Sequence, residues 1–229
     1  MTSQPYLLVV HPSIPGTSLK DLIAYAKSRP GKLNYASSGT GGAGHLGMEL
    51  LKSVTGMDMV HVPYRGIGPG IIDLLGGQVQ MLFGSAPSVA PHVQSGKLKA
   101  IAVTTEKRSK FFPELPTISE SGVPGFELNG WYGLVAPGAI RPSMLGTRHQ
   151  SVKQVLGNPD IQARFAADGS EVAASSSPAE FKNLVSREIA RWEKFVRTSG
   201  FKAVVSKNSA EVRGKLLAWV RCRRCSHFC

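Results

Sequence analysis

The sequence predicts an α/β protein with a largely parallel sheet and helices on both of its faces. Apolar runs of strand length alternate with stretches of helical period from residue 6 to residue 104. Glycine and proline, with 25 and 15 residues, are frequent but follow no period, so they separate short elements. Strands that alternate with helices in this way form parallel sheets, because each helix carries the chain back across the sheet.

The expected elements have identifiable starts and ends. Ser18 can cap the first helix, and the break at residues 29–31 ends it. Gly56 lies just past the end of the second helix, where a left-handed residue is common. The expected strands cover residues 6–11, 33–37, 59–64, 79–83 and 98–104. The first two expected helices start after residue 18 and after the glycine-rich turn 39–44, and the next two cover residues 69–75 and 87–94.

Beyond residue 105 the pattern changes, which indicates a domain change between about residues 105 and 136. Residues 107–126 are rich in turn formers, and residues 127–135 form an extended apolar segment. Helices are expected over residues 143–156 and after residue 159, followed by a short strand over residues 171–174. The stretch from Ser177 to Glu180 has the pattern of a capping box and opens a long helix with a continuous apolar stripe.

Half of the net charge of +12 lies at the C-terminus. Residues 201–229 contain seven basic residues, one acid and all three cysteines of the chain. The remaining residues are mildly basic, which suits anionic ligands, and contain no cysteine for a disulfide framework or a thiol nucleophile. Cys222, Cys225, His227 and Cys229 are residue types that bind zinc, but their close spacing leaves little room for a tetrahedral site. We therefore expect a basic, unstructured tail over residues 204–229.

The basic tail also motivates an alternative function, that of a nucleic-acid-binding protein. Against this alternative, the chain has no aromatic residues interleaved with the basic ones and no recognised nucleic-acid-binding motif. No run reaches the roughly 18 apolar residues of a membrane span. The first apolar run, residues 6–10, is short and follows no basic segment, so it predicts a strand and not a signal peptide.

The first candidate site runs from Ser37 to His45, between an expected strand and an expected helix. The free N–H groups of a first helical turn, the helix dipole and a run of small residues together favour a bound anion. Ser37, Ser38 and Thr40 add hydroxyl donors, and Gly39 opens the run of small residues. Two simpler explanations remain: the glycines serve the turn alone, and His45 packs locally. The segment lacks the Lys-Ser/Thr of a P-loop and the acidic residue of a dinucleotide site.

Two further segments end at the same expected sheet edge, where open α/β sheets bind their ligands. Tyr64 and Arg65 follow the third strand, and Arg65 is either a carboxylate partner or a solvated loop residue. Gly84 and Ser85 form another strand-to-helix junction, where Ser85 can contact an oxyanion or cap the helix.

No catalytic constellation is present in the sequence. It contains no Gly-x-Ser-x-Gly elbow, no His-Glu-x-x-His motif and no paired carboxylates in a plausible cleft. The aromatic pair Trp131-Tyr132 supplies either a cleft wall or core packing. Loops of small polar residues without a general base indicate recognition, not catalysis. We therefore expect a binding protein that is not an enzyme and uses no cofactor or metal.

Several segments, taken in order and at their spacing, resemble one family. These segments are residues 33–39 with His45 and Leu46, then residues 61–66, 73–80, 96–104, 115–126 and 131–137. Together they resemble the Bug family, the solute receptors of tripartite tricarboxylate transporters. The resemblance runs from about Gln4 to about Ala203, and the ordered combination is far more specific than any single segment.

The resemblance implies a type II periplasmic binding-protein fold, in which two α/β lobes close on a ligand. It implies a small carboxylate or related metabolite as ligand, held by backbone N–H groups and bridging waters, a membrane permease as partner, and work in the periplasm. Residues 5–135 would be the second, ligand-binding lobe, and residues 136–203 would be C-terminal segments of the first lobe. The candidate ligand-binding residues are Ser37, Ser38, Gly39, Thr40, His45, Tyr64, Gly84 and Ser85.

The chain departs from the family pattern in its first lobe. The signal peptide and the opening strand, loop and helix of a family member have no counterpart before residue 5, so we expect an N-terminally truncated receptor whose first lobe is incomplete. Lobe closure and affinity would then be impaired. The stripe on the helix over residues 181–196 would also remain partly uncovered and favour association.

Overall fold

The computed structural model describes residues 2–167 and 169–199, and the predicted tail over residues 204–229 lies outside them. The elements are β1 (Thr2–Val10), α1 (Leu19–Lys27), β2 (Leu33–Ser37), α2 (Ala43–Thr55), β3 (Met59–Pro63), α3 (Ile67–Leu75), β4 (Met81–Ser85), α4 (Ala86–Gln94), β5 (Lys99–Val103), β6 (Asn129–Tyr132), α5 (Pro142–Leu156), α6 (Pro159–Ala167), β7 (Glu171–Val172) and α7 (Pro178–Thr198). They form two units. The larger unit contains Ser3–Trp131 and Phe165–Glu171, and the smaller one contains Thr2, Tyr132–Arg164 and Val172–Ser199.

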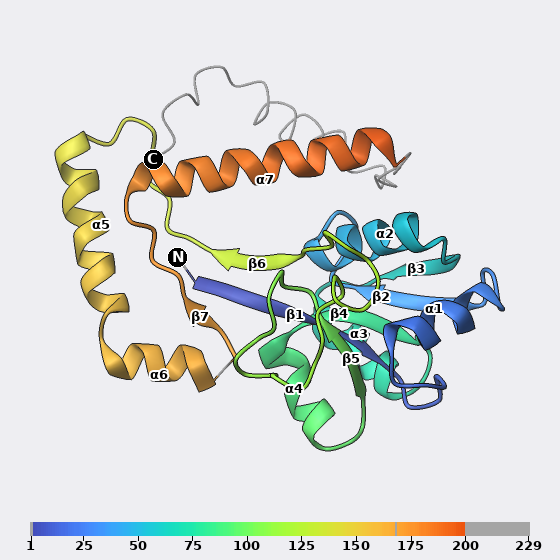
Figure 1. Ribbon diagram of the computed structural model, residues 1–229. Helices are drawn as coiled ribbons and strands as arrows, with labels where there is room; N and C mark the ends of the chain where they lie inside the picture. Colours follow the sequence, from blue (N-terminus) through green and yellow to red (C-terminus); the bar gives the residue numbers. More distant parts are fainter. Residues whose placement is uncertain (1, 168, 200–229) are drawn as a thin grey trace. The chain divides into compact units, whose positions relative to one another are not determined.

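The larger unit is built on a sheet with the strand order β3-β2-β4-β1-β5 (Figure 1). β2 runs parallel to both of its neighbours, β3 and β4. β1 runs antiparallel to β4 and β5, so our prediction of a largely parallel sheet was wrong for this strand. The hydrophobic period of a segment identifies it as a strand but does not encode its direction.

β1 begins at Thr2, four residues before the start that the apolar run predicts. Its first residues are polar but find partners inside the larger unit. The Asn129 side-chain amide donates to Ser3 Oγ at 2.8 Å, and the Gln4 amide donates to Ser170 Oγ at 3.2 Å. Hydrogen-bonded polar side chains extend the strand where hydrophobicity gives no signal.

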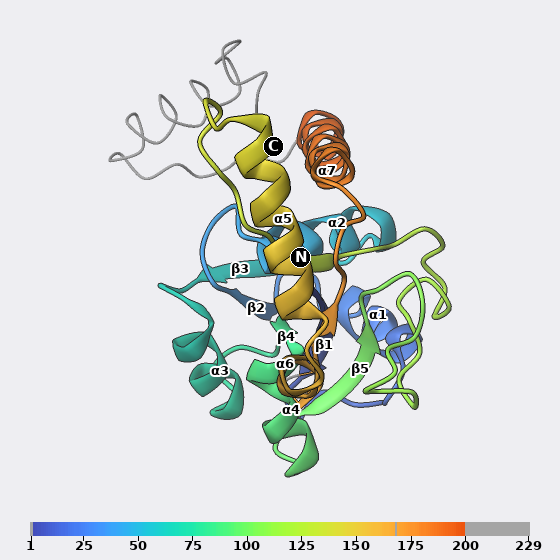
Figure 2. The same cartoon turned by 90° about the vertical axis from the view of Figure 1, so that its left-hand side faces the viewer.

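The sheet of the larger unit is covered on both faces, as predicted. Leu7, Leu8, Val9 and Val10 are consecutive in β1 and are all fully buried, although successive strand residues point to opposite faces. Helices α3 and α4 cover one face, and α1 and α2 lie over the other (Figure 2). The core below α3 and α4 consists of Leu7, Val9, Ala36, Ile71, Leu74, Val79, Leu82, Val89, Leu98 and Val103.

The predicted helix ends are confirmed for α1 and α2. The Ser18 hydroxyl accepts from the Asp21 N–H, and the Asp21 carboxylate accepts from the Ser18 N–H in return. Gly56 ends α2 in the left-handed conformation, with φ of 71°.

The smaller unit contains α5 and α7. Ser177 caps α7 as predicted and accepts from the Glu180 N–H at 3.2 Å. The Glu180 carboxylate binds Ser176 in place of the N-cap backbone, so the predicted capping box is half formed. No residue of α7 is fully buried, and Ile189 and Val196 on its apolar stripe are 38% and 40% exposed. Among the described helices, none has the length and hydrophobicity required to cross a membrane.

Candidate anion-binding site

Two strand-to-helix junctions meet at one edge of the sheet in the larger unit. β2 and β4 are parallel neighbours, with Tyr35 opposite Met81 and Ala36 opposite Leu82. α2 starts after the end of β2, and α4 starts at the end of β4. The first turn of α2 also packs closely on β4, since a Cβ added to Gly44 would lie 3.1 Å from the Phe83 carbonyl oxygen. Both helix N-termini therefore open at the carboxyl ends of adjacent strands, where α/β proteins bind ligands.

The junction after β2, residues 37–44, is named here the glycine loop. Gly39 and Gly41 have φ of 135° and 82°, a region that other residues rarely adopt. The Gly42 N–H donates to the Gly39 carbonyl at 3.2 Å, and the Gly39 N–H donates to Ser37 Oγ at 3.2 Å. At these two positions the glycines are required by the turn itself.

The first turns of both helices present N–H groups that their own helices cannot use. Gly42 caps α2 without a side-chain hydrogen bond, which leaves the N–H groups of Ala43 and Gly44 without an intrahelical acceptor. Ser85 caps α4, again without a side-chain cap. The positive ends of two helix dipoles add to these donors, so the edge favours a negatively charged group.

Ser38 and Thr40 lie on the open side of the glycine loop. Both residues are exposed, and their hydroxyl groups make no hydrogen bond within the described part of the chain. Gly39 is half-buried between them. These are the predicted site residues that the structure presents to solvent at this edge.

Ser37 and His45 point inward instead. Ser37 is fully buried, and its hydroxyl lies 2.6 Å from His61 Nε2. His45 is 5% exposed, and its Nδ1 accepts from the Gly41 N–H at 3.0 Å. Both side chains hold the glycine loop from below, and the local packing of His45 that the sequence left open is observed.

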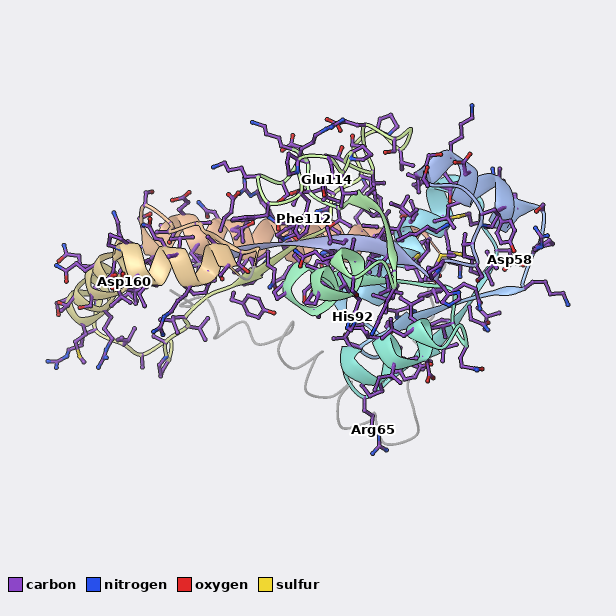
Figure 3. All side chains as sticks on the ribbon, turned by 90° about the horizontal axis from the view of Figure 1, so that it is seen from below. Asp58, Arg65, His92, Phe112, Glu114 and Asp160 are labelled. Carbon is purple, nitrogen blue, oxygen red and sulfur yellow. The ribbon has the colours of Figure 1, made fainter. Side chains whose placement is uncertain are left out.

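Tyr64 is also tied to the protein. Its hydroxyl donates to the Asp73 carboxylate at 2.5 Å, and its N–H donates to the Ser37 carbonyl at 3.0 Å. Burial and the Asp73 carboxylate raise the pKa of Tyr64 to about 12, so the phenol stays protonated. Arg65 is exposed and extends away from the larger unit, which agrees with a solvated loop residue (Figure 3).

The junction after β4, residues 84–88, is named here the serine junction. Gly84 is buried, and a Cβ there would lie 2.3 Å from Val89 Cγ1. The Ser88 hydroxyl donates to the Ser85 carbonyl at 2.8 Å, so the Ser85 hydroxyl donates across the 2.6 Å contact to Ser88 Oγ. Ser85 itself is half-buried, and its hydroxyl oxygen can still accept a hydrogen bond from a water.

Of the predicted aromatic pair, Trp131 is half-buried in the larger unit, and Tyr132 of the smaller unit is 64% exposed. A cavity of about 620 Å³ lies in the smaller unit between α5, the segment over residues 133–140 and the start of α7. Its lining is mostly apolar, with Leu134, Ile140 and Phe181 among it. It also includes Arg148, His149 and Lys153, but none of the predicted site residues lines this cavity, so the glycine loop and the serine junction remain the candidate site.

His61 is the residue of this region that the sequence did not single out as a site residue. Its ring stacks on His45 with the centroids 3.7 Å apart and on Tyr35 with the centroids 4.9 Å apart. Burial lowers the pKa of His61 to about 4 and also lowers the pKa of His45. The alternation of side chains along β3 could have indicated that His61 faces inward, because it follows buried Met59 by two residues and so lies on the same face of the strand.

Beneath the stack lies a polar pair from α2. The Tyr35 hydroxyl donates to Glu49 Oε1 at 2.6 Å, and Lys52 Nζ bonds the same oxygen at 2.7 Å. In the residues that the structure describes, no cluster of three or more His, Cys, Asp or Glu side chains could hold a metal ion. The cysteines and histidine of the tail lie outside those residues.

An open α/β sheet with helix N-termini directed at an anion is typical of a small-anion binding protein. Residues 1–201 match the family described as the tripartite tricarboxylate transporter family receptor, so the chain belongs to that family. The resemblance to Bug proteins is thereby confirmed, and neither the family nor the relatives below support the nucleic-acid-binding alternative. Members of this family are binding receptors and not enzymes.

The protein BugT of Bordetella pertussis is 34% identical over 198 residues, which are 86% of this chain and 60% of BugT. A protein of R. palustris, solved with adipate, is 38% identical with a TM-score of 0.81, over 87% of this chain and 67% of that one. MatC from Rhodopseudomonas palustris, solved with bound malate, is 30% identical with a TM-score of 0.77, over 85% of this chain and 67% of MatC. These structures confirm the predicted periplasmic binding-protein-like α/β fold.

Proposed function

We propose that this chain belongs to a solute receptor of a tripartite transporter and binds a small carboxylate at the edge formed by the glycine loop and the serine junction. The observation that carries the proposal is the convergence of two helix N-termini on adjacent strands, next to exposed hydroxyl groups. The neighbours solved with adipate and malate support a carboxylate as the ligand.

In this proposal the predicted site residues divide into two groups. Ser38 and Thr40 donate their hydroxyl groups to the ligand, and Gly39 and Ser85 line the site and contact the ligand through bridging waters. The remaining four predicted residues position the backbone: Ser37, His45, Tyr64 and Gly84. This division follows their burial and their hydrogen bonds within the protein.

The lobes and partners follow from the family. In this proposal residues 5–135 form the second, ligand-binding lobe, and residues 136–203 are C-terminal segments of the first lobe, which closes over the ligand in a complete receptor. The loaded receptor delivers its ligand to a membrane permease in the periplasm, and it performs no catalysis.

A binding screen tests the proposal. The purified chain is melted with adipate, malate and other small mono-, di- and tricarboxylates, with the diamide of adipic acid as an uncharged control. A ligand that binds the folded state raises the melting temperature, and about 100-fold excess over Kd adds about 2.7 kcal/mol. Carboxylates should raise it and the diamide should not. A cooperative melt that no carboxylate shifts would contradict the proposed function.

Two variants locate the site. The double substitution Ser38→Ala with Thr40→Ala removes the exposed hydroxyl donors and should weaken carboxylate binding about tenfold, as expected for lost hydrogen bonds to a charged group. Ser53→Ala is the matched control, because Ser53 is an exposed serine near the other end of α2 and bonds the Leu50 carbonyl. Equal affinity of the double variant and the control would place the ligand elsewhere.

A further inference from the structure

Two histidines from different elements meet face to face beneath the glycine loop. His45 comes from the first turn of α2 and His61 from the middle of β3. Their ring centroids are 3.7 Å apart, and the ring planes differ by 11°. Tyr35 of β2 lies beside this pair, with its ring centroid 4.9 Å from that of His61 and 6.2 Å from that of His45. Two strands and one helix thus contribute to one cluster of three rings.

Each histidine is hydrogen-bonded to a different point of the glycine loop. His45 Nδ1 accepts from the Gly41 N–H, so this nitrogen carries no proton and neutral His45 is protonated on Nε2. The Ser37 hydroxyl lies 2.6 Å from His61 Nε2, and its oxygen accepts from the Gly39 N–H at 3.2 Å. The loop is therefore held at Gly41 by one ring and at Gly39, through Ser37, by the other.

The surroundings of the pair favour two uncharged rings. Besides Tyr35, the titratable and charged groups that face the pair are Glu49 and Lys52 of α2. Glu49 is already bonded to the Tyr35 hydroxyl and to Lys52, so its charge is largely compensated. Desolvation is the main cause that lowers the pKa of both histidines, and each charged ring would oppose a charge on the other.

We propose that the neutral His45–His61 pair is the positioning device of the glycine loop, and that protonation of the pair in acid releases the loop and the bound carboxylate. This inference rests on the proposed function for its ligand, but the loop itself can be tested without one. A proton on His45 Nδ1 removes the acceptor of the Gly41 N–H and sets two N–H groups against each other. The positive end of the α2 dipole opposes the same charge.

A cationic His45 would also attract an anion, so the two effects compete. The ring is 5% exposed and lies below the loop, with its acceptor nitrogen directed at the Gly41 N–H. Loss of the loop geometry displaces several N–H donors from the carboxylate at once. The attraction between the His45 cation and the carboxylate acts over a longer distance, because the loop lies between them. The expected net effect of acid is therefore release.

Amide hydrogen exchange of the ligand-free protein is the first measurement, followed from pH 7.5 to pH 4 and corrected for intrinsic exchange. Protection of Gly39 and Gly41 should fall at least tenfold across this range. The double substitution His45→Asn with His61→Gln replaces both rings by amide groups, which donate or accept hydrogen bonds but do not titrate. It should show no such fall. His92→Gln removes a histidine at the far end of α4 and should behave as the unaltered protein.

Adipate affinity over the same pH range is the second measurement. The ionisation of adipate affects all variants equally, so the ratio of Kd values between the unaltered protein and the double variant isolates the histidines. That ratio should rise at least fivefold toward acid. A double variant with the same pH profile of exchange and affinity as the unaltered protein would overturn the inference.

His45→Phe gives an independent check, because it keeps an aromatic ring but removes the acceptor. It should lose Gly41 protection already at pH 7.5; retained protection would count against the inference. If this variant does not fold, the soluble double variant still decides. Failure of every carboxylate to bind at any pH would refute the proposed function alone, while the exchange data on the ligand-free protein would still test the positioning role.

Discussion

The glycine loop and the serine junction occupy the same structural position but are held in place by different means. Each follows a parallel strand and opens a helix at the same sheet edge. The glycine loop adopts left-handed backbone angles and depends on hydrogen bonds with two histidine rings outside it. The serine junction satisfies its own hydroxyl groups and is fixed by the packing of Gly84 under Val89. One half of the site should therefore respond to protonation and the other to side-chain volume.

The largest expected effect comes from volume at the serine junction. Gly84→Ala places a Cβ 2.3 Å from Val89 Cγ1 and 3.0 Å from Leu82 Cδ1, and both neighbours are fully buried. Overpacking of a core contact costs up to about 3 kcal/mol of unfolding free energy. Urea denaturation followed by circular dichroism measures this loss.

Gly68→Ala is the matched control for that substitution. Gly68 lies in α3 with no atom within 4 Å of an added Cβ, and alanine is the better helix former by about 1 kcal/mol. Its stability should stay level or rise. Equal stabilities of the two variants would show that the backbone at Gly84 yields to the new methyl group.

A smaller effect is expected from acid at the glycine loop. The pKa of His61 is about 4 in the folded protein and about 6.5 when unfolded, so below pH 6.5 the unfolded chain binds a proton that the folded protein does not. Stability is therefore lost between pH 6.5 and pH 4 and levels off below. The shift of the His61 pKa from about 6.5 to about 4 corresponds to about 3 kcal/mol of unfolding free energy. Solvent screening at the half-buried ring reduces this loss to roughly 2 kcal/mol.

The difference between the unaltered protein and His61→Gln isolates this contribution, since carboxylates titrate equally in both. Urea unfolding at pH 7 and pH 4 should show a steeper loss in the unaltered protein. Parallel losses in the two proteins would mean that His61 is hydrated in the folded state.

Sequence patterns predicted the elements of this fold well but not their geometry. The strands at Leu33–Ser37 and Met59–Pro63 and the cap at Ser18 follow from period and capping rules, which are local properties. The antiparallel direction of β1 does not follow, because strand direction depends on partners that are distant in the sequence. The polar first residues of β1 were also missed, because their hydrogen-bond partners Asn129 and Ser170 are distant in the sequence.

The candidate site was predictable in its location but not in its contacts. A strand, a glycine run and a helix predict an anion cradle from local rules alone. The inward roles of Ser37 and His45 depend on His61, which lies 24 residues beyond Ser37 and reaches it through the pairing of β2 with β3. A motif read within one segment cannot reveal a hydrogen bond that a second strand supplies.

The smallest effect is expected from backbone strain in the glycine loop, and it separates stability from binding. Gly41 has φ of 82° with open space around it, so Gly41→Ala costs about 1 kcal/mol of unfolding free energy through backbone conformation alone. Gly96→Ala is the matched control, because Gly96 has φ of 71°, equally open space and a place after α4, away from the loop. Both variants should lose similar stability in urea, whereas Gly41→Ala alone should weaken carboxylate binding, because it shifts the N–H that His45 holds. Equal binding by the two variants would mean that the ligand does not depend on the conformation of the glycine loop, and the contrast with the serine junction would then be one of stability and not of recognition.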